Sequence, residues 1–186
     1  MRIILASASP RRLALLDQIG IKPDLVINVN CCEAPLLGEL PRNLADRLAR
    51  VKALAAPAEI GDVIIAADTV VAVGRRILDK TEDKDQALKH LTLLSGRRHC
   101  VYTAVAVRSG DRVLCRNVIS NLRVKRLSAG EIEAYLATDE WRGKAGSYAI
   151  QGHFARFVPW IQGSYSAIMG LPLSETSTLL STFRVP

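Results

Sequence analysis

Strand-like and helix-like segments alternate along this chain of 186 residues. The apolar run "RIILA" near the amino end is typical of a short buried strand, and a helical pattern over residues 10–18 follows it directly. A longer β-type run, "DVIIAADTVVAV", lies between helices predicted at about residues 41–56 and 83–94. Because strands that alternate with helices build sheets covered by those helices, the sequence predicts an α/β fold.

Hairpins are expected among the strands as well. The runs "CVYTAVAV" and "RVLCRNVISNLRV" are separated by "RSGD", a hairpin signal, and Gly74 turns the long β-type run back into "RRILDK". A capping box at residues 128–131 opens a helix to about Thr138. Strand-like sequence then continues to Met169, and a final helix follows Pro172. We therefore expect a mixed sheet flanked by helices, in a single domain of residues 1–186 with two lobes around a central cleft.

The net charge favours a negatively charged ligand. It is +7 at pH 7, but the lysines and arginines are scattered along the chain. Aromatic residues make up only 5% of the sequence, so the stacking surface of a single-strand binder is missing. A phosphorylated small molecule fits this composition better than a nucleic acid does.

The hydropathy pattern argues against a membrane protein. No apolar run reaches the ~20 residues that cross a bilayer. The opening "MRIILA" is too short for a secretory signal before Arg11 and Arg12 interrupt it. We expect a soluble, cytoplasmic protein without a membrane partner.

The cysteines carry no metal or disulfide signature. Neither a CxxC motif nor a histidine pair at ligand spacing is present, and His90, His99 and His153 are isolated. We expect buried free thiols at all four positions: Cys31, Cys32, Cys100 and Cys115.

Two arginines stand at the start of the first predicted helix, within "SASPRR". Ser9 is a good N-cap and Pro10 suits the first helical position. The positive end of the helix dipole repels cations, at a cost of ~0.3–1 kcal/mol each, and attracts anions. A bound phosphate would reverse that cost, so the arginines indicate a phosphate site.

Helical spacing separates the two arginines. Arg12 falls within an apolar arc and is expected to point inward, whereas Arg11 lies at its rim; the arc comprises Leu13, Leu15, Leu16 and Ile19. We infer phosphate binding for Arg12. A solvated Arg11 is as compatible with the sequence as a phosphate-binding one, and a buried carboxylate could pair with Arg12 instead.

A carboxylate interrupts the long β-type run at "AADT". Burying it unpaired would cost several kcal/mol, so Asp68 must face a cation, a metal or a strand end open to water. Ligands of α/β sheets bind at the carboxyl ends of strands, and we expect "SASPRR" and "AADT" to lie at such ends. A structural salt bridge at a sheet edge is the alternative.

Three charged residues are ambiguous when each is taken alone. Glu33 lies in a loop and Lys80 follows a short strand, and both resemble ordinary surface charges. Lys52 borders the apolar face of the second helix, where a lysine can extend its amine to solvent.

The segment "GKAGSYAIQG" has the features of a ligand-binding loop. Its glycines would let the backbone approach a ligand closely, and Gln151 offers both a donor and an acceptor to a base edge. From glycine spacing alone it could equally be a plain loop.

Six blocks of sequence, in order, resemble the Maf family of nucleotide pyrophosphatases. They are "SASPRRLALL", "LARVKA", "AADTVV", "LSGRRHCVYTAVAV", "GKAGSYAIQG" and "GSYSAIMGLPLSET", and they span almost the whole chain. The resemblance implies a Maf/ITPase-like fold, a homodimer, and an enzyme dependent on Mg²⁺ or Mn²⁺ that hydrolyses nucleoside triphosphates to the monophosphate and pyrophosphate. "KAGSYAIQG" looks like the branch that acts on dTTP and UTP, with CTP and modified pyrimidine nucleotides left open.

The resemblance also implies roles for single residues. Asp68 matches the family's proton acceptor, and Glu33 joins it as a metal ligand. Arg12, Thr69 and Gln151 match positions tied to substrate choice. The full substrate-binding set is Ser9, Arg11, Arg12, Lys52, Thr69, Lys80 and Gln151.

Two positions depart from the family pattern. Thr81 follows Lys80 where a proline is common, and alanine precedes Asp68 where glycine is common. A nucleotide-binding regulator of cell division and septum formation, without turnover, is the alternative function.

Overall fold

A computed structural model describes residues 1–185. Within them, seven strands form one mixed sheet in the order β2-β1-β3-β5-β6-β7, with β4 paired to β3. The strands are β1 (Ile3–Leu5), β2 (Leu25–Val26), β3 (Val63–Val73), β4 (Arg76–Leu78), β5 (Arg98–Ser109), β6 (Arg112–Arg123) and β7 (Trp160–Gln162). The α/β prediction and the mixed sheet are confirmed.

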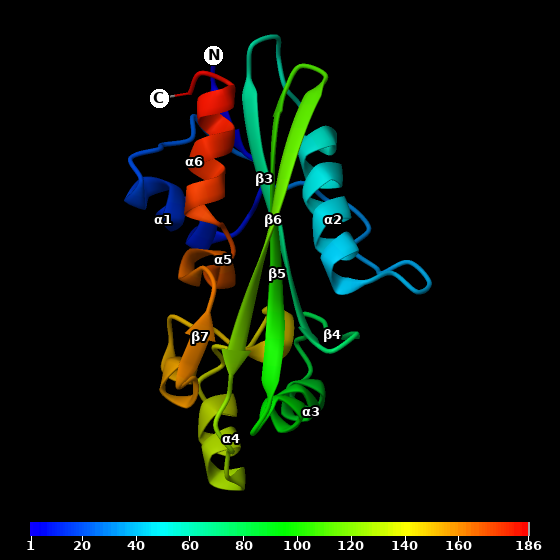
Figure 1. The fold of residues 1–186 in the computed structure, drawn as a ribbon, viewed down its shortest axis with the longest axis vertical. Helices are drawn as coiled ribbons and strands as arrows, with labels where there is room; N and C mark the ends of the chain where they lie inside the picture. Colours follow the sequence, from blue (N-terminus) through cyan, green and yellow to red (C-terminus); the bar gives the residue numbers. More distant parts are fainter. Residues whose placement is uncertain (186) are drawn as a thin grey trace.

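Helices cover the sheet and fill its lower end (Figure 1). The α-helices are α1 (Pro10–Gln18), α2 (Pro41–Ala55), α3 (Lys84–Leu94), α4 (Ala129–Leu136), α5 (Tyr165–Met169) and α6 (Leu173–Thr182). Two short 3₁₀ turns, η1 (Ala145–Ser147) and η2 (His153–Phe157), follow α4. None of the helices in residues 1–185 is long and apolar enough to cross a membrane.

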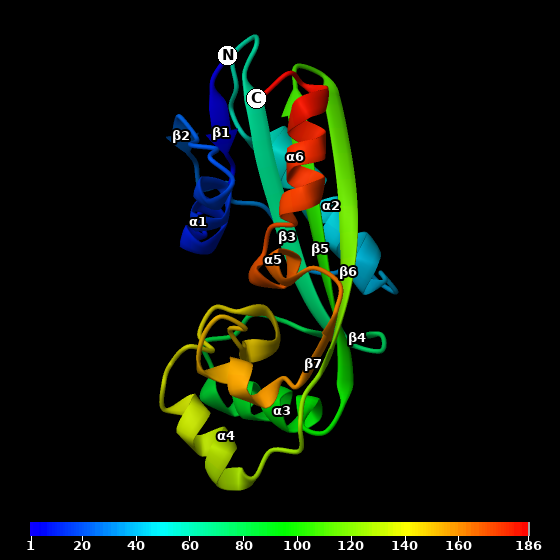
Figure 2. The same cartoon turned by 60° about the vertical axis from the view of Figure 1, so that its left-hand side comes forward.

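The molecule has two lobes joined by the long β5–β6 hairpin (Figure 2). In the upper lobe, α2 packs on one face of the sheet, and α1 and α6 lie on the other face. In the lower lobe, α3, α4 and η2 enclose a separate core around Leu91, Tyr135 and Phe154. The predicted two-lobed arrangement is therefore present.

One edge of β3 is open between the lobes. β1 pairs with residues 63–65 of β3, and β4 pairs on the same side with residues 71–73, while β5 occupies the opposite edge. Asp68 lies in the stretch between them, directly opposite Ala104 of β5. The expected strand end at "AADT" is therefore wrong, because β5 pairs with β3 throughout. The opening comes from the missing neighbour on the other edge.

The segment before Met169 also differs from its prediction. Residues 165–169 form α5 and not a strand, because Ser164 caps the turn by accepting a hydrogen bond from the Ala167 amide at 3.2 Å. Gly170 then ends the helix with φ of 128°. This short helix carries one wall of the cavity described below.

The four cysteines are free, but their burial differs from the prediction. Cys115 is buried in the sheet, and burial raises the pKa of its thiol to about 12. Cys32 is exposed, while Cys31 and Cys100 are half-buried. Cys31 and Cys32 lie in an irregular loop before α2, which buries its side chains less than a strand does.

Candidate active site

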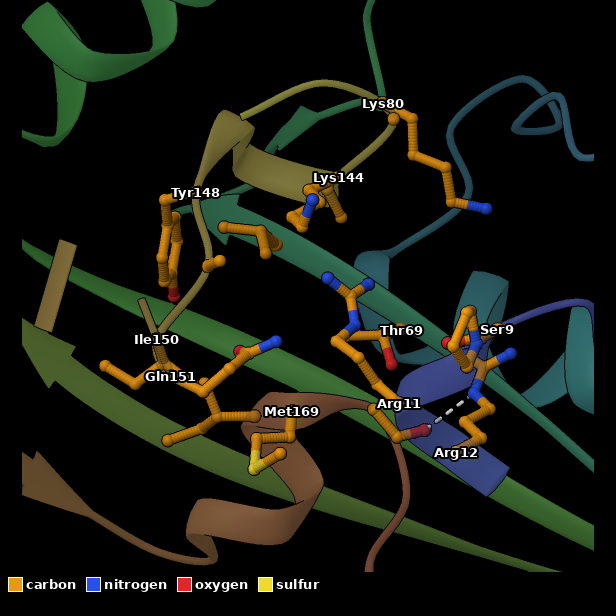
Figure 3. A pocket seen from close by; sticks show the side chains of 17 residues that line it. Ser9, Arg11, Arg12, Thr69, Lys80, Lys144, Tyr148, Ile150, Gln151 and Met169 are labelled. Carbon is orange, nitrogen blue, oxygen red and sulfur yellow. Dashed lines mark hydrogen bonds between the residues drawn. The ribbon is translucent and has the colours of Figure 1, made fainter. Parts of the chain in front are cut away.

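A cavity of about 480 Å³ lies between the lobes (Figure 3). The start of α1, β3, the segment around η1 and the end of α5 line it. A second cavity of about 350 Å³ adjoins it and shares Thr69, Lys80 and Ala145 with it. The first cavity contains Ser9, Arg11, Arg12 and Gln151, and the second contains Glu33 and Asp68. The structure therefore brings most of the sequence-predicted residues together.

Arg12 points inward, as predicted. Its Nε donates to the carbonyl oxygen of Gly170 at 2.8 Å and its Nη1 donates to the Ser7 hydroxyl at 3.0 Å. Burial lowers the pKa of Arg12, and the negative charge of Asp68 opposes that shift. Arg12 thus ties the start of α1 to the end of α5.

Arg11 is half-buried, in agreement with its expected place at the rim of the apolar arc. Its guanidinium points into the cavity, and its buried Nε has no hydrogen-bond partner within residues 1–185 (Figure 3). The predicted apolar arc was too wide, since Leu13 is 40% exposed and α1 buries Leu15 and Leu16. Burial lowers the pKa of Arg11.

Ser9 occupies the N-cap position of α1, where its side chain forms no capping hydrogen bond. It lines the cavity beside the arginines. The positive end of the α1 dipole and the Ser9 hydroxyl therefore lie at the same cavity, which suits an anion.

A chain of alternating charges crosses the second cavity. Lys52 Nζ donates to Asp68 Oδ1 and to Glu33 Oε1, each at 2.5 Å, and Lys80 Nζ donates to Glu33 Oε2 at 2.8 Å. Asp68 and Lys52 are almost fully buried, whereas Glu33 and Lys80 are partly exposed. Lys52 comes from the inner face of α2 and does not extend to solvent, which resolves the alternative left open by the sequence.

The network favours the charged forms of Glu33 and Lys52. Burial alone would raise the pKa of Glu33, but its hydrogen bonds to Lys52 and Lys80 outweigh burial and lower that pKa to about 2. Burial alone would lower the pKa of Lys52, but Asp68 and Glu33 together raise it. At neutral pH the site therefore contains an ionised Glu33 carboxylate next to the ammonium group of Lys52.

The loop that carries Gln151 is held in place by buried hydrogen bonds. His90 Nδ1 lies 2.8 Å from the Ser147 hydroxyl, and His99 Nε2 lies 2.8 Å from the Tyr148 hydroxyl. The Ala149 amide donates to the Tyr135 hydroxyl at 3.1 Å. The "GKAGSYAIQG" segment thus forms a wall of the cavity that buried hydrogen bonds hold in position. Gln151 projects from this wall toward Arg11 (Figure 3).

Sequence reasoning missed several residues of this wall. His90 and His99 received no role because they are isolated in the sequence, yet both are buried and support the loop. Lys144 was also missed, although it lines the cavity. Its position within the same glycine-rich segment as Gln151 was the available signal.

The carboxylates fit a divalent cation. Magnesium keeps several of its waters and uses one or two protein carboxylates together with substrate phosphates. Glu33 and Asp68 provide two carboxylates at one side of the cavity, held by the same lysine. Within residues 1–185 no three histidine, cysteine or acidic side chains are grouped to hold an ion.

The family model for Maf-like proteins matches residues 2–183. The chain belongs to the Maf family. A dTTP/UTP pyrophosphatase of Cereibacter sphaeroides is 54% identical over 186 residues, covering 100% of this chain and 97% of the relative. One of Rhodospirillum rubrum is 54% identical over 96% of this chain and 86% of the relative. A nucleoside triphosphate pyrophosphatase of Anaplasma marginale is 51% identical, covering 96% and 92%.

Solved structures support the fold assignment of this Maf protein. The Ham1 protein of Staphylococcus aureus matches with a TM-score of 0.53 at 14% identity, over 98% of this chain and 99% of that one. A HAM1 protein from Coxiella burnetii gives a TM-score of 0.54 at 14% identity, over 97% and 98%. At this level of identity the likeness concerns the fold alone.

Proposed function

We propose that this protein hydrolyses dTTP and UTP to the nucleoside monophosphate and pyrophosphate. The observation that carries the proposal is the joining of two unlike cavities, one with the buried Asp68–Lys52–Glu33 network and one with Gln151 and apolar side chains. The network and the neighbouring arginines suit a charged triphosphate, and the wall that carries Gln151 suits a base. The names of the Cereibacter and Rhodospirillum relatives support this choice of substrates.

The reaction requires a water molecule aligned with the α-phosphorus and cations near the non-bridging oxygens. We assign to Asp68 the role of orienting the attacking water molecule or accepting its proton. Lys52 holds Asp68 through Oδ1, so the position of that carboxylate is fixed before substrate binds. Arg11, Arg12, Lys80 and the Ser9 hydroxyl are proposed to bind substrate oxygens.

Mg²⁺ or Mn²⁺ would be held by Glu33 and Asp68. A bound ion would neutralise charge on the phosphate oxygens as bonding to phosphorus changes. Lys52 and Lys80 already bind Glu33, so ion binding and these ammonium groups compete for the same carboxylate oxygens.

Thr69 and Gln151 are proposed to contribute to base selection. Thr69 Oγ1 lies 3.2 Å from the Thr103 hydroxyl, which donates to the Ala167 carbonyl oxygen at 2.7 Å and so links β3, β5 and α5. Gln151 offers a donor and an acceptor at the other wall. A base that leaves the Gln151 amide unpaired would be rejected.

Pyrophosphate release from a panel of nucleoside triphosphates with Mn²⁺ tests this function. We expect turnover with UTP and dTTP, and much lower turnover with purine nucleotides. Binding of these nucleotides without pyrophosphate release would contradict the proposal and favour the regulatory alternative.

Replacement Asp68→Asn tests the proposed role of Asp68. We expect turnover to fall by a factor of ~10² or more, because loss of a positioned acid–base group typically costs 10²–10⁴. The fold is expected to persist, since Glu33 still pairs with Lys52. Circular dichroism and UTP binding check the fold, and wild-type turnover in a folded variant would contradict the assignment.

We also propose that the protein acts in the cytoplasm as a homodimer. The family resemblance favours both statements.

A further inference from the structure

Lys144 lies on the cavity wall that carries Gln151 and adds a cation to the one that Arg11 provides from α1. It is half-buried, and the contact that its Nζ makes is to the Arg142 carbonyl oxygen at a long 3.4 Å. Arg11 enters the same space from α1, and Figure 3 shows its guanidinium between Lys144 and Gln151. Neither cation forms a salt bridge to a carboxylate in the described part of the chain.

These two cations disfavour each other in the free protein. Burial lowers the pKa of Lys144, and the positive charge of Arg11 lowers it further. Both side chains donate hydrogen bonds and accept none. The space between them therefore favours a ligand that presents acceptor oxygens.

The side of this cavity opposite Ser9 and Arg12 suits a base better than a phosphate chain. Tyr148, Ile150 and Met169 contribute apolar surface to the same cavity, and Figure 3 shows Ile150 and Met169 near Gln151. The carboxylates and Lys52, which suit a triphosphate and its metal ion, lie toward the adjoining cavity. Flat apolar walls with a few convergent donors are typical of a site for a heterocycle.

Uracil and thymine differ from cytosine at C4 and at N3. They carry a carbonyl oxygen at C4 and a hydrogen on N3, whereas cytosine carries a donating amino group at C4 and an N3 that accepts. An ammonium group next to that amino group would lose its acceptor and remain desolvated, which is a strong basis for rejection. We propose that Lys144 is a specificity-determining residue that donates to the C4 carbonyl oxygen of uracil and thymine and thereby discriminates against cytosine. This proposal rests on the proposed function and names the group by which that site selects its base.

The ratio of kcat/KM for UTP to that for CTP tests the proposal in Lys144→Met. Loss of a charge-assisted hydrogen bond should lower this ratio about tenfold or more, with the loss confined mainly to UTP. Lys89→Met is the matched control, since Lys89 is exposed on α3 away from the cavity and its ratio should equal that of the wild type. An equal loss for both nucleotides would place Lys144 on the phosphates and overturn the proposal, as would an unchanged ratio.

Binding measurements separate this proposal from the proposed function. Titration calorimetry gives Kd for UTP and CTP without turnover, in Asp68→Asn and in Asp68→Asn with Lys144→Met. The same fall in the UTP preference is expected there. A wild-type protein that releases no pyrophosphate would contradict the proposed function, and the two Kd ratios would still decide the role of Lys144.

Discussion

Lys52 is far more deeply buried than Lys80, the other lysine of the ion-pair network. It is 6% exposed, and its single ammonium group serves both Asp68 and Glu33. A buried ion pair of this kind adds little net stability, but breaking it by removing one partner is costly because the other charge is left uncompensated. Lys52 therefore matters for folding as well as for the proposed chemistry.

Replacement Lys52→Met should destabilise the protein by about 3–5 kcal/mol, because it leaves Asp68 buried without a cation. The double variant Lys52→Met with Asp68→Asn should lose less, since no buried carboxylate remains at that position. Urea unfolding of the two variants measures the difference, with Lys89→Met as the surface control. A double variant less stable than Lys52→Met alone would contradict this account.

Single residues show how far the sequence could predict the site. The cost of burying a carboxylate predicts that Asp68 meets a cation, and it does, in Lys52. The identity of that cation was not predictable, because Lys52 lies 16 residues away and meets Asp68 only after α2 packs on β3. Leu13 was placed in the buried arc of α1 although it is 40% exposed, because helical spacing gives a direction and not the depth at which α1 is packed.

The loop of residues 143–152 depends on backbone conformations that favour glycine. Gly146 has φ of 72°, and a Cβ there would lie 2.8 Å from Val71 Cγ1 of β3. The loop approaches β3 this closely at Gly146, and Gln151 of the same loop lines the cavity. A side chain at position 146 would therefore disturb both the loop conformation and the cavity wall that the loop forms.

Replacement Gly146→Ala should destabilise the protein by ~1–3 kcal/mol and raise the KM for UTP, because strain and the clash with Val71 together displace the loop. Gly110→Ala is the matched control: Gly110 has φ of 57°, and nothing lies within 4 Å of its Cβ position. Its cost should be limited to the backbone strain, with no change in KM. Equal effects on KM in both variants would contradict the prediction.

Elements with strong local signals were predicted more accurately than those set by tertiary contacts. The capping box places the start of α4 correctly, with the Ser128 hydroxyl accepting from the Glu131 amide. The glycine turn after β3 and the β5–β6 hairpin are also confirmed. The short helix α5 was missed because five residues with one serine cap resemble the end of a strand.

The two lobes share the β5–β6 hairpin, whose residues contribute to each core. Val101 and Leu122 pack in the lower core, whereas Val105 and Val107 pack in the upper one. We propose on this ground that residues 1–186 fold as a single domain. The open edge of β3 lies between the lobes, so the fold itself creates the cavity at Asp68. No motif in the sequence predicts this gap, because it arises from the lengths of β1 and β4.

In the proposed reaction, water attacks the α-phosphorus of a pyrimidine nucleoside triphosphate in this cavity. Hydrolysis of UTP in water enriched in the heavy oxygen isotope, followed by mass spectrometry of the products, tests this step. We predict UMP and pyrophosphate in equal amounts, with the heavy oxygen in UMP. Heavy oxygen in pyrophosphate, or release of orthophosphate and UDP, would contradict the account.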